Sequence, residues 1–205
     1  MASMSSEEVK NSYTSSMGEE LGSAFFHLDQ KLVELHIVWQ QFRQLYGMNE
    51  ETVQLLNRTA GLFFKVVQDE LWDSVLLGVS RMTDPADTRW GKNLTIQSLP
   101  PLIAEPGLKA EVQNLCDTAV GIAIFARNHR NKRIAHQDHN YLVNRTSNPI
   151  DGVSRERVEI MLEALRKVMN RLNSHFRDTT VIYKDFLDET GARLLVSKLI
   201  KLERL

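Results

Sequence analysis

Residues 126–139 hold the densest group of potentially reactive side chains in the chain. The segment reads Ala-Arg-Asn-His-Arg-Asn-Lys-Arg-Ile-Ala-His-Gln-Asp-His. Its basic and titratable residues are Arg127, His129, Arg130, Lys132, Arg133, His136 and His139. The formal net charge of the whole chain is only -1, so this positive charge is a local feature. It directly follows an apolar run, residues 119–126, which predicts a core helix that leaves the interior with a cationic end.

Three interpretations fit this segment. It could be a solvated helix end, whose positive charge complements the helix dipole. It could bind a metal, since His129, His136 and His139 share one helix face. The neighbouring cations oppose this, and Asp138 is the sole carboxylate nearby, so we predict no metal site.

The third possibility is chemistry on an anion. A histidine with an ordinary pKa of ~6.5 can transfer protons near neutral pH. Arginines beside it can bind a phosphate and stabilise the charge that develops during its transfer. With a ribose 2'-hydroxyl as the nucleophile, such a site could cleave RNA without a metal.

Composition excludes several other classes of protein. The chain has 205 residues, of which 42% are hydrophobic and 25% charged, as in ordinary globular domains. Cys116 is the single cysteine, which rules out an internal disulfide framework. No apolar run approaches the ~20 residues that cross a bilayer, and the Ser-rich start has no apolar signal core. No glycine-rich phosphate loop occurs. We therefore predict a cytoplasmic protein with no membrane contact and no cofactor.

The apolar periodicity predicts helices. Residues 1–18 are rich in serine and predict a disordered tail. A first helix, ending near Gly47, has an apolar stripe made of Leu21, Phe25, Leu28, Leu32, Leu35, Trp39 and Phe42. A second, ending before Asp84-Pro85, has a stripe made of Leu56, Ala60, Phe63, Val67, Leu71, Val75, Val79 and Met82.

The rest of the chain continues this pattern after a proline-rich connection with one short helical turn near 94–99. A third helix is predicted over 107–139, with residues 119–126 buried on all sides. After a break at 144–152, a fourth helix begins near Ser154 and points Val158, Met161, Leu165, Val168, Met169 and Leu172 inward. Residues 178–186 are predicted to be extended or looped, and a last helix to span 189–205. We predict an all-α, up-and-down helical bundle over 19–177 and an extension over 178–205 with an extra C-terminal helix.

Residues 130–136, Arg-Asn-Lys-Arg-Ile-Ala-His, resemble the R-x(4–6)-H motif of HEPN domains, with the expected polar residue after the arginine. Upstream, Val-Ser-Arg-Met-Thr-Asp-Pro at 79–85 and Asn-Leu-Thr-Ile at 93–96 look like the abortive-infection AbiU-like branch of that superfamily. In that branch the motif has the form RDKRLAH. The resemblance covers roughly residues 20–175.

The resemblance implies a HEPN-like bundle that forms a homodimer, with two motifs facing one cleft. Many such proteins are metal-independent endoribonucleases of toxin-antitoxin or phage-defence systems. In that case RNA is the substrate, an antitoxin protein is a possible partner, and His136 transfers a proton. Arg130 would hold the scissile phosphate and Asn131 would orient the site. The remaining phosphate-binding candidates are Arg127, His129, Lys132 and Arg133.

Two questions stay open at this point. On a regular helix Arg130 and His136 lie about 120° apart, so a helix irregularity or the long arginine side chain must bring them together. If the helix is regular, Arg133 shares a face with His136 and would take over part of the role of Arg130. The alternative function is a non-catalytic HEPN module that binds a nucleotide, RNA or a protein partner.

Two residues outside the motif also have alternative roles. Arg81 could face the same cleft, but pairing with Asp84 at the helix end is the interpretation we favour. Trp90 lies between Arg89 and Lys92 and could stack on a base. A loop tryptophan more commonly covers the end of a bundle, and we expect that role here.

Overall fold

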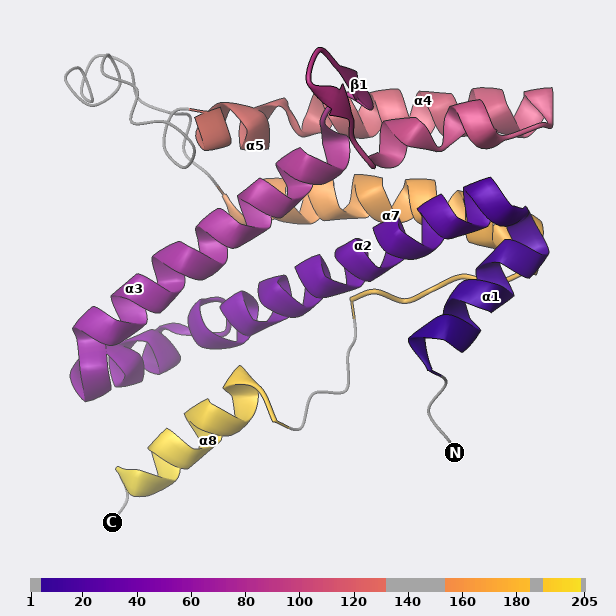
Figure 1. Ribbon diagram of the computed structural model, residues 1–205. Helices are drawn as coiled ribbons and strands as arrows, with labels where there is room; N and C mark the ends of the chain where they lie inside the picture. The colour runs from indigo at the N-terminus through magenta and orange to yellow at the C-terminus, as the bar shows by residue number, and fades with distance from the viewer. Residues whose placement is uncertain (1–4, 132–153, 185–189, 204–205) are drawn as a thin grey trace.

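The structure is a computed structural model that describes residues 5–131, 154–184 and 190–203. Its helices are α1 (Ser6–Met17), α2 (Glu19–Tyr46), α3 (Glu50–Thr83), α4 (Pro106–Ile122), α5 (Ile124–His129), α7 (Arg155–Arg177) and α8 (Ala192–Leu202) (Figure 1). Two short 3-10 turns, Ile96–Ser98 and Pro100–Leu102, lie in the connection before α4. The strands described are β1 (Asp87–Thr88) and β2 (Gly91–Lys92), which form one small hairpin. The predicted all-α bundle is confirmed.

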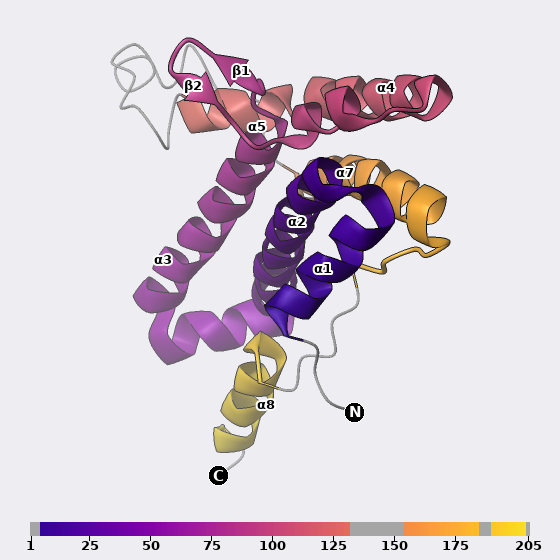
Figure 2. The same cartoon turned by 45° about the vertical axis from the view of Figure 1, so that its right-hand side comes forward.

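The core lies between α2, α7 and the helices that cross them. Every residue of the apolar stripe predicted for α2 is buried, and so is every residue predicted to point inward from α7. Both stripes repeat at intervals of three and four residues, which keeps them on one helix face. Figures 1 and 2 show α7 beside α2, with α4 along its other side and α3 diverging from α2 toward α5.

The predicted disordered tail over 1–18 is wrong for most of its length, because residues 6–17 form α1. Ser5 and Glu8 cap its first turn reciprocally, which satisfies backbone groups that a helix start leaves free. Tyr13 and Met17 are buried against α2. The two helices approach so closely that a Cβ at Gly22 would lie 2.5 Å from Thr14 Cα. Two buried side chains and a cap therefore order a segment whose composition is mostly polar.

α3 is a kinked helix, and the kink changes the predicted buried face. Ala60 has φ -158° and ψ 65°, which interrupts the helix. After it Val75, Val79 and Met82 are buried as predicted, but Phe63 is 62% exposed and Phe64 is buried in its place. Because the stripe was extended through the kink as if the helix were regular, it is wrong next to the kink, where Ala60 and Phe63 are exposed.

The predicted third helix is in fact two helices. α4 ends at Ile122, Ala123 forms a turn, and α5 continues to His129. The run over 119–126 is not buried on all sides: Ala119, Ala123 and Ala126 face the core, whereas Ile124 is 53% exposed. Small residues line the inner face because α5 packs closely on α3. The predicted continuation over 132–139 and the break at 144–152 lie outside the described residues.

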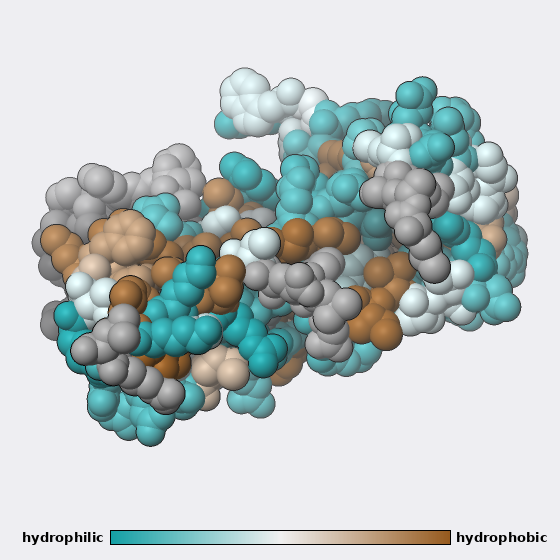
Figure 3. Space-filling model, turned by 90° about the horizontal axis from the view of Figure 1, so that it is seen from below, coloured by the Kyte–Doolittle hydropathy of each residue, from teal (hydrophilic) through white to brown (hydrophobic). Residues whose placement is uncertain are grey.

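The extension after α7 packs back onto the bundle. Asn170 brackets Val181, donating to its carbonyl (3.0 Å) and accepting from its amide (2.9 Å), and Tyr183 is buried. α8 then contacts α2, where the backbone N–H groups of Ala192 and Arg193 donate to Gln41 and Gln44. Seen from below, apolar side chains form several patches between polar ones along this face (Figure 3). Among the described residues, no helix is both long and apolar enough to span a membrane.

Candidate functional site

The site is built at the C-terminal end of α3. Asp84 caps this helix and Pro85 follows it, because the residue before a proline avoids helical geometry. Thr83 Oγ1 donates back to the carbonyl of Val79 (2.9 Å). Gln97 Nε2 donates to the main-chain oxygens of Thr83 and Asp84, both at 3.0 Å. These hydrogen bonds fix the backbone of Thr83 and Asp84, and so they fix the point from which the Asp84 side chain extends.

Two arginines of the motif region converge on this carboxylate. Arg130 Nη1 donates to Asp84 Oδ2 at 2.6 Å. Arg127 Nε lies 3.6 Å from Asp84 Oδ1, and its Nη2 donates to the carbonyl of Thr83 at 2.7 Å. All three charged side chains are half-buried, with exposed fractions between 20% and 25%. One carboxylate thus faces two guanidinium groups, so the cluster keeps surplus positive charge that an anion can neutralise.

Arg130 and Asn131 form the start of the motif as a fixed pair. Arg130 Nε donates to Asn131 Oδ1 at 3.1 Å, while its Nη1 is occupied by Asp84. Both residues lie in a wider, π-helical turn that continues α5. Such turns shift the positions of the residues that follow, and they are frequent at functional sites. Together with the break at Ala123, this turn shows that the helix carrying the motif is irregular.

His129 takes a different position from the one predicted. Its side chain is buried, with 3% of the residue exposed, and its Nε2 lies 3.3 Å from Asp73 Oδ1 on α3. A buried ring cannot contact the phosphate of a bound RNA in this conformation. The predicted phosphate contact at His129 is therefore corrected: the ring packs α5 onto α3. Arg127 likewise contacts the end of α3, through the Thr83 carbonyl and the Asp84 carboxylate.

The second half of the motif lies outside the described residues. This applies to the predicted proton-transfer residue His136 and to the phosphate-binding candidates Lys132 and Arg133. Within the described part of the chain no group of histidine, cysteine, aspartate and glutamate side chains could hold a metal ion. His136 and His139 are not covered by that search, so the predictions for these residues stay predictions.

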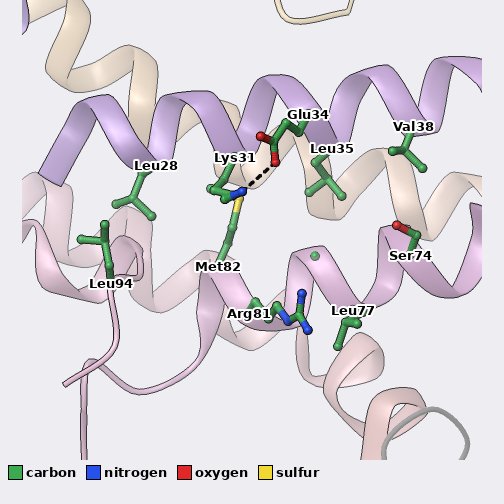
Figure 4. A pocket seen from close by; sticks show the side chains of 11 residues that line it. Leu28, Lys31, Glu34, Leu35, Val38, Ser74, Leu77, Arg81, Met82 and Leu94 are labelled. Atoms are coloured by element: carbon green, nitrogen blue, oxygen red, sulfur yellow. Dashed lines mark hydrogen bonds and ion pairs between the residues drawn. The ribbon is translucent and has the colours of Figure 1, made fainter. Parts of the chain in front are cut away.

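Arg81 does not pair with Asp84, which corrects the role we favoured for it. It is exposed and lines a groove of about 380 Å³ between α2 and α3 (Figure 4). Leucine and methionine side chains form much of that groove, and Lys31 and Glu34, both on α2, make an ion pair along one side of it at 2.8 Å. Asp84 instead receives arginines that follow it by more than forty positions, and the sequence offered no signal for that pairing.

A family model, HEPN_AbiU2, described as AbiU2, matches residues 18–194. The chain belongs to the AbiU2 family of HEPN domains. Membership confirms the predicted HEPN superfamily and AbiU-like branch, and places the chain among abortive-infection HEPN domains. The match includes α2 to α7, the proposed site and the extension up to α8. Neither the curated proteins nor the solved structures contain a match to this chain.

Proposed function

We propose that this AbiU2 domain is a metal-independent endoribonuclease of a toxin-antitoxin or phage-defence system, acting through Arg130, Asn131 and His136. The observation that carries the proposal is the surplus positive charge where Arg127 and Arg130 share Asp84. Within the described residues, Arg130 Nη2 has no hydrogen-bond partner, so it can donate to a phosphate oxygen. A charge-assisted contact of this kind stabilises the scissile phosphate as negative charge builds up on it.

The proposed reaction uses the RNA's own 2'-hydroxyl as nucleophile. The 2'-oxygen bonds to the adjacent phosphorus while the bond from phosphorus to the 5'-oxygen of the next nucleotide breaks. A base accepts the proton of the 2'-hydroxyl and an acid protonates the departing oxygen. The products are a 2',3'-cyclic phosphate and a 5'-hydroxyl. His136 carries one of these two protons, because an imidazole exchanges protons near neutral pH.

A homodimer belongs to the same proposal. Each motif supplies one histidine for proton transfer, His136. The reaction needs both an acid and a base, and the two-fold axis of a homodimer provides a second copy of the motif. Exposed apolar side chains near the motif support a subunit contact: Ile124 on α5 is 53% exposed and Ile160 on α7 is 46% exposed. An antitoxin protein that covers this site is the partner expected in a toxin-antitoxin system.

The subunit contact is tested by a charge on each of these isoleucines. Ile124→Glu and Ile160→Glu should shift the protein toward monomer in light scattering and reduce cleavage in parallel. Ile37→Glu is the matched control, since Ile37 is 43% exposed on α2 and away from the motif. A wild-type monomer at micromolar concentration would remove the dimer from the proposal.

The catalytic proposal is tested by incubating purified protein with total RNA in the presence of EDTA. His136→Ala should reduce the cleavage rate by about 10²–10⁴ with little change in RNA binding. Arg130→Ala should reduce both cleavage and binding, because it removes a phosphate contact. His27→Ala and Arg193→Ala, exposed on α2 and α8, should change neither. Tight binding without any cleavage by the wild type would favour the non-catalytic module instead.

A further inference from the structure

The β1–β2 hairpin presents an exposed tryptophan beside the candidate site. Asp87 pairs with Lys92 and Thr88 with Gly91, which places Arg89 and Trp90 at the turn. Trp90 is 83% exposed, so it does not cover the end of the bundle as we expected from the sequence. Leaving so much of an indole in water is unfavourable, which points to a ligand for this ring.

Arg89 prepares one face of that ring. Its guanidinium carbon lies 4.5 Å from the centre of the Trp90 ring, in a cation–π contact that restrains both side chains. The opposite face of the indole remains available for a flat partner. Every nucleobase has such a face, and the adjacent guanidinium is suited to the phosphate of the same nucleotide.

The hairpin is anchored to the residues that form the site. At its base the Asn93 backbone N–H donates to the carbonyl of Ala86 (2.7 Å), and Asn93 Nδ2 donates to the carbonyl of Pro85 (3.0 Å). Pro85 directly follows Asp84, which receives Arg130. Figures 1 and 2 both show the hairpin at the end of the molecule that α5 occupies. Three residues of strand from Ala86 to Arg89 extend about 10 Å, which sets how far the turn lies from the base of the hairpin.

We propose that Trp90 stacks on an unpaired base of a single-stranded RNA while Arg89 holds a neighbouring phosphate, so that the hairpin positions the strand across Arg130. This proposal rests on the proposed function and names its substrate class. A duplex would not present the face of a base to the indole, because its bases stack on one another. An apolar protein partner fits less well, since the residues around Trp90 in the hairpin, from Asp87 to Asn93, are polar, charged or glycine.

The test uses the full chain and two uncleavable probes: a short 2'-O-methyl oligouridylate, and the same backbone with abasic sites. Trp90→Ala should weaken oligouridylate binding about ten-fold or more, whereas Trp90→Phe should retain most of the affinity. The wild type should lose a similar factor on the abasic probe, and Trp90→Ala should lose little more on that probe. Phe63→Ala removes another exposed aromatic ring, 62% exposed on α3, and should change nothing.

The outcomes separate the two proposals. If the wild type binds and cleaves RNA but Trp90→Ala binds both probes as the wild type does, the stacking proposal is wrong and the endoribonuclease proposal stands. If Trp90→Ala changes the oligomeric state instead, the indole is a subunit contact and the stacking proposal is also overturned. A wild type that neither binds nor cleaves any RNA overturns both.

Discussion

Two aspartates of this molecule each contact two other side chains. One aspartate lies in the core and the other lies near the surface. Asp29 on α2 is 5% exposed and accepts hydrogen bonds from the hydroxyls of Tyr13 and Tyr183. Asp84 at the end of α3 is half-buried and pairs with Arg127 and Arg130. The first carboxylate has neutral donors and the second has cations.

The difference in donors separates a structural cluster from a chemical one. Tyr13 belongs to α1 and Tyr183 to the extension after α7, so Asp29 connects both of these segments to α2 by hydrogen bonds. Burial raises the pKa of Asp29 and of Tyr183, and it raises the pKa of Tyr13 to about 12, so neither hydroxyl ionises near neutral pH. The Asp84 cluster is only partly closed and keeps an unneutralised cation. A polar cluster that satisfies itself stabilises a fold, whereas one with surplus charge is available to a ligand.

Removing the core carboxylate should have the largest effect on stability. Asp29→Ala leaves two buried hydroxyls without their acceptor and opens a cavity, so the free energy of unfolding should fall by about 3 kcal/mol or more. Urea denaturation measures this change in the free energy of unfolding. Asp117→Ala, at an exposed position on α4, should stay within about 0.5 kcal/mol of the wild type. An Asp29→Ala protein as stable as that control would contradict the role of the core cluster.

Removing the surface carboxylate should cost less stability and more function. Asp84→Asn keeps the shape but removes the charge that holds both guanidinium groups, so we expect a loss of about 1–2 kcal/mol in unfolding free energy. Cleavage should fall because Arg130 loses its orientation, while RNA affinity is kept or increased because a negative charge is gone. Asp117→Asn removes an exposed charge on α4 and serves as the control. A parallel loss of affinity and cleavage would contradict this prediction, because binding as well as cleavage would then depend on how Asp84 orients Arg130.

The same contrast explains what could be predicted from the sequence. The stripes of α2 and α7 were predicted because burial on one helix face is a periodic property of nearby residues. α1 was missed, although its Ser5 and Glu8 spacing is a recognisable cap, because its order depends on Tyr13 meeting Asp29 across a helix pair. The break at Ala123 was missed because an uninterrupted apolar run has no period that could reveal it.

The chemistry of the site could be predicted from the sequence, whereas the partners of its side chains could not. A dense cationic segment indicated an anion site, and two arginines of that segment, Arg127 and Arg130, lie together at one end of α3. Their shared partner Asp84 is distant in the sequence, and that pairing depends on the packing of α5 against α3. The burial of His129 depends on the same packing, so a residue that looked exposed by composition turned out to be structural.

The smallest predicted effect is a pH dependence that belongs to the core alone. Burial, together with the nearby Arg166 and Lys184, lowers the pKa of His36 to about 3. Arg166 Nη1 lies 3.5 Å from His36 Nε2, and since arginine can only donate, this nitrogen must accept and the ring is neutral. The Tyr183 ring stacks on the His36 ring.

A depressed pKa in the folded protein means that acid favours the unfolded chain, where the histidine titrates near ~6.5. The stability due to neutral His36 is complete above that pH and falls as the pH drops toward 3, at up to about 1.4 kcal/mol per unit. From about pH 7.5 to about pH 5.5 we therefore expect a loss of about 1 kcal/mol from this group. His36→Gln should remove that part of the slope in denaturant titrations, whereas His27→Gln, at an exposed position, should keep it. If both variants retain the wild-type slope, another group in the core accounts for it, and Asp29 does not, because its raised pKa produces the opposite sign.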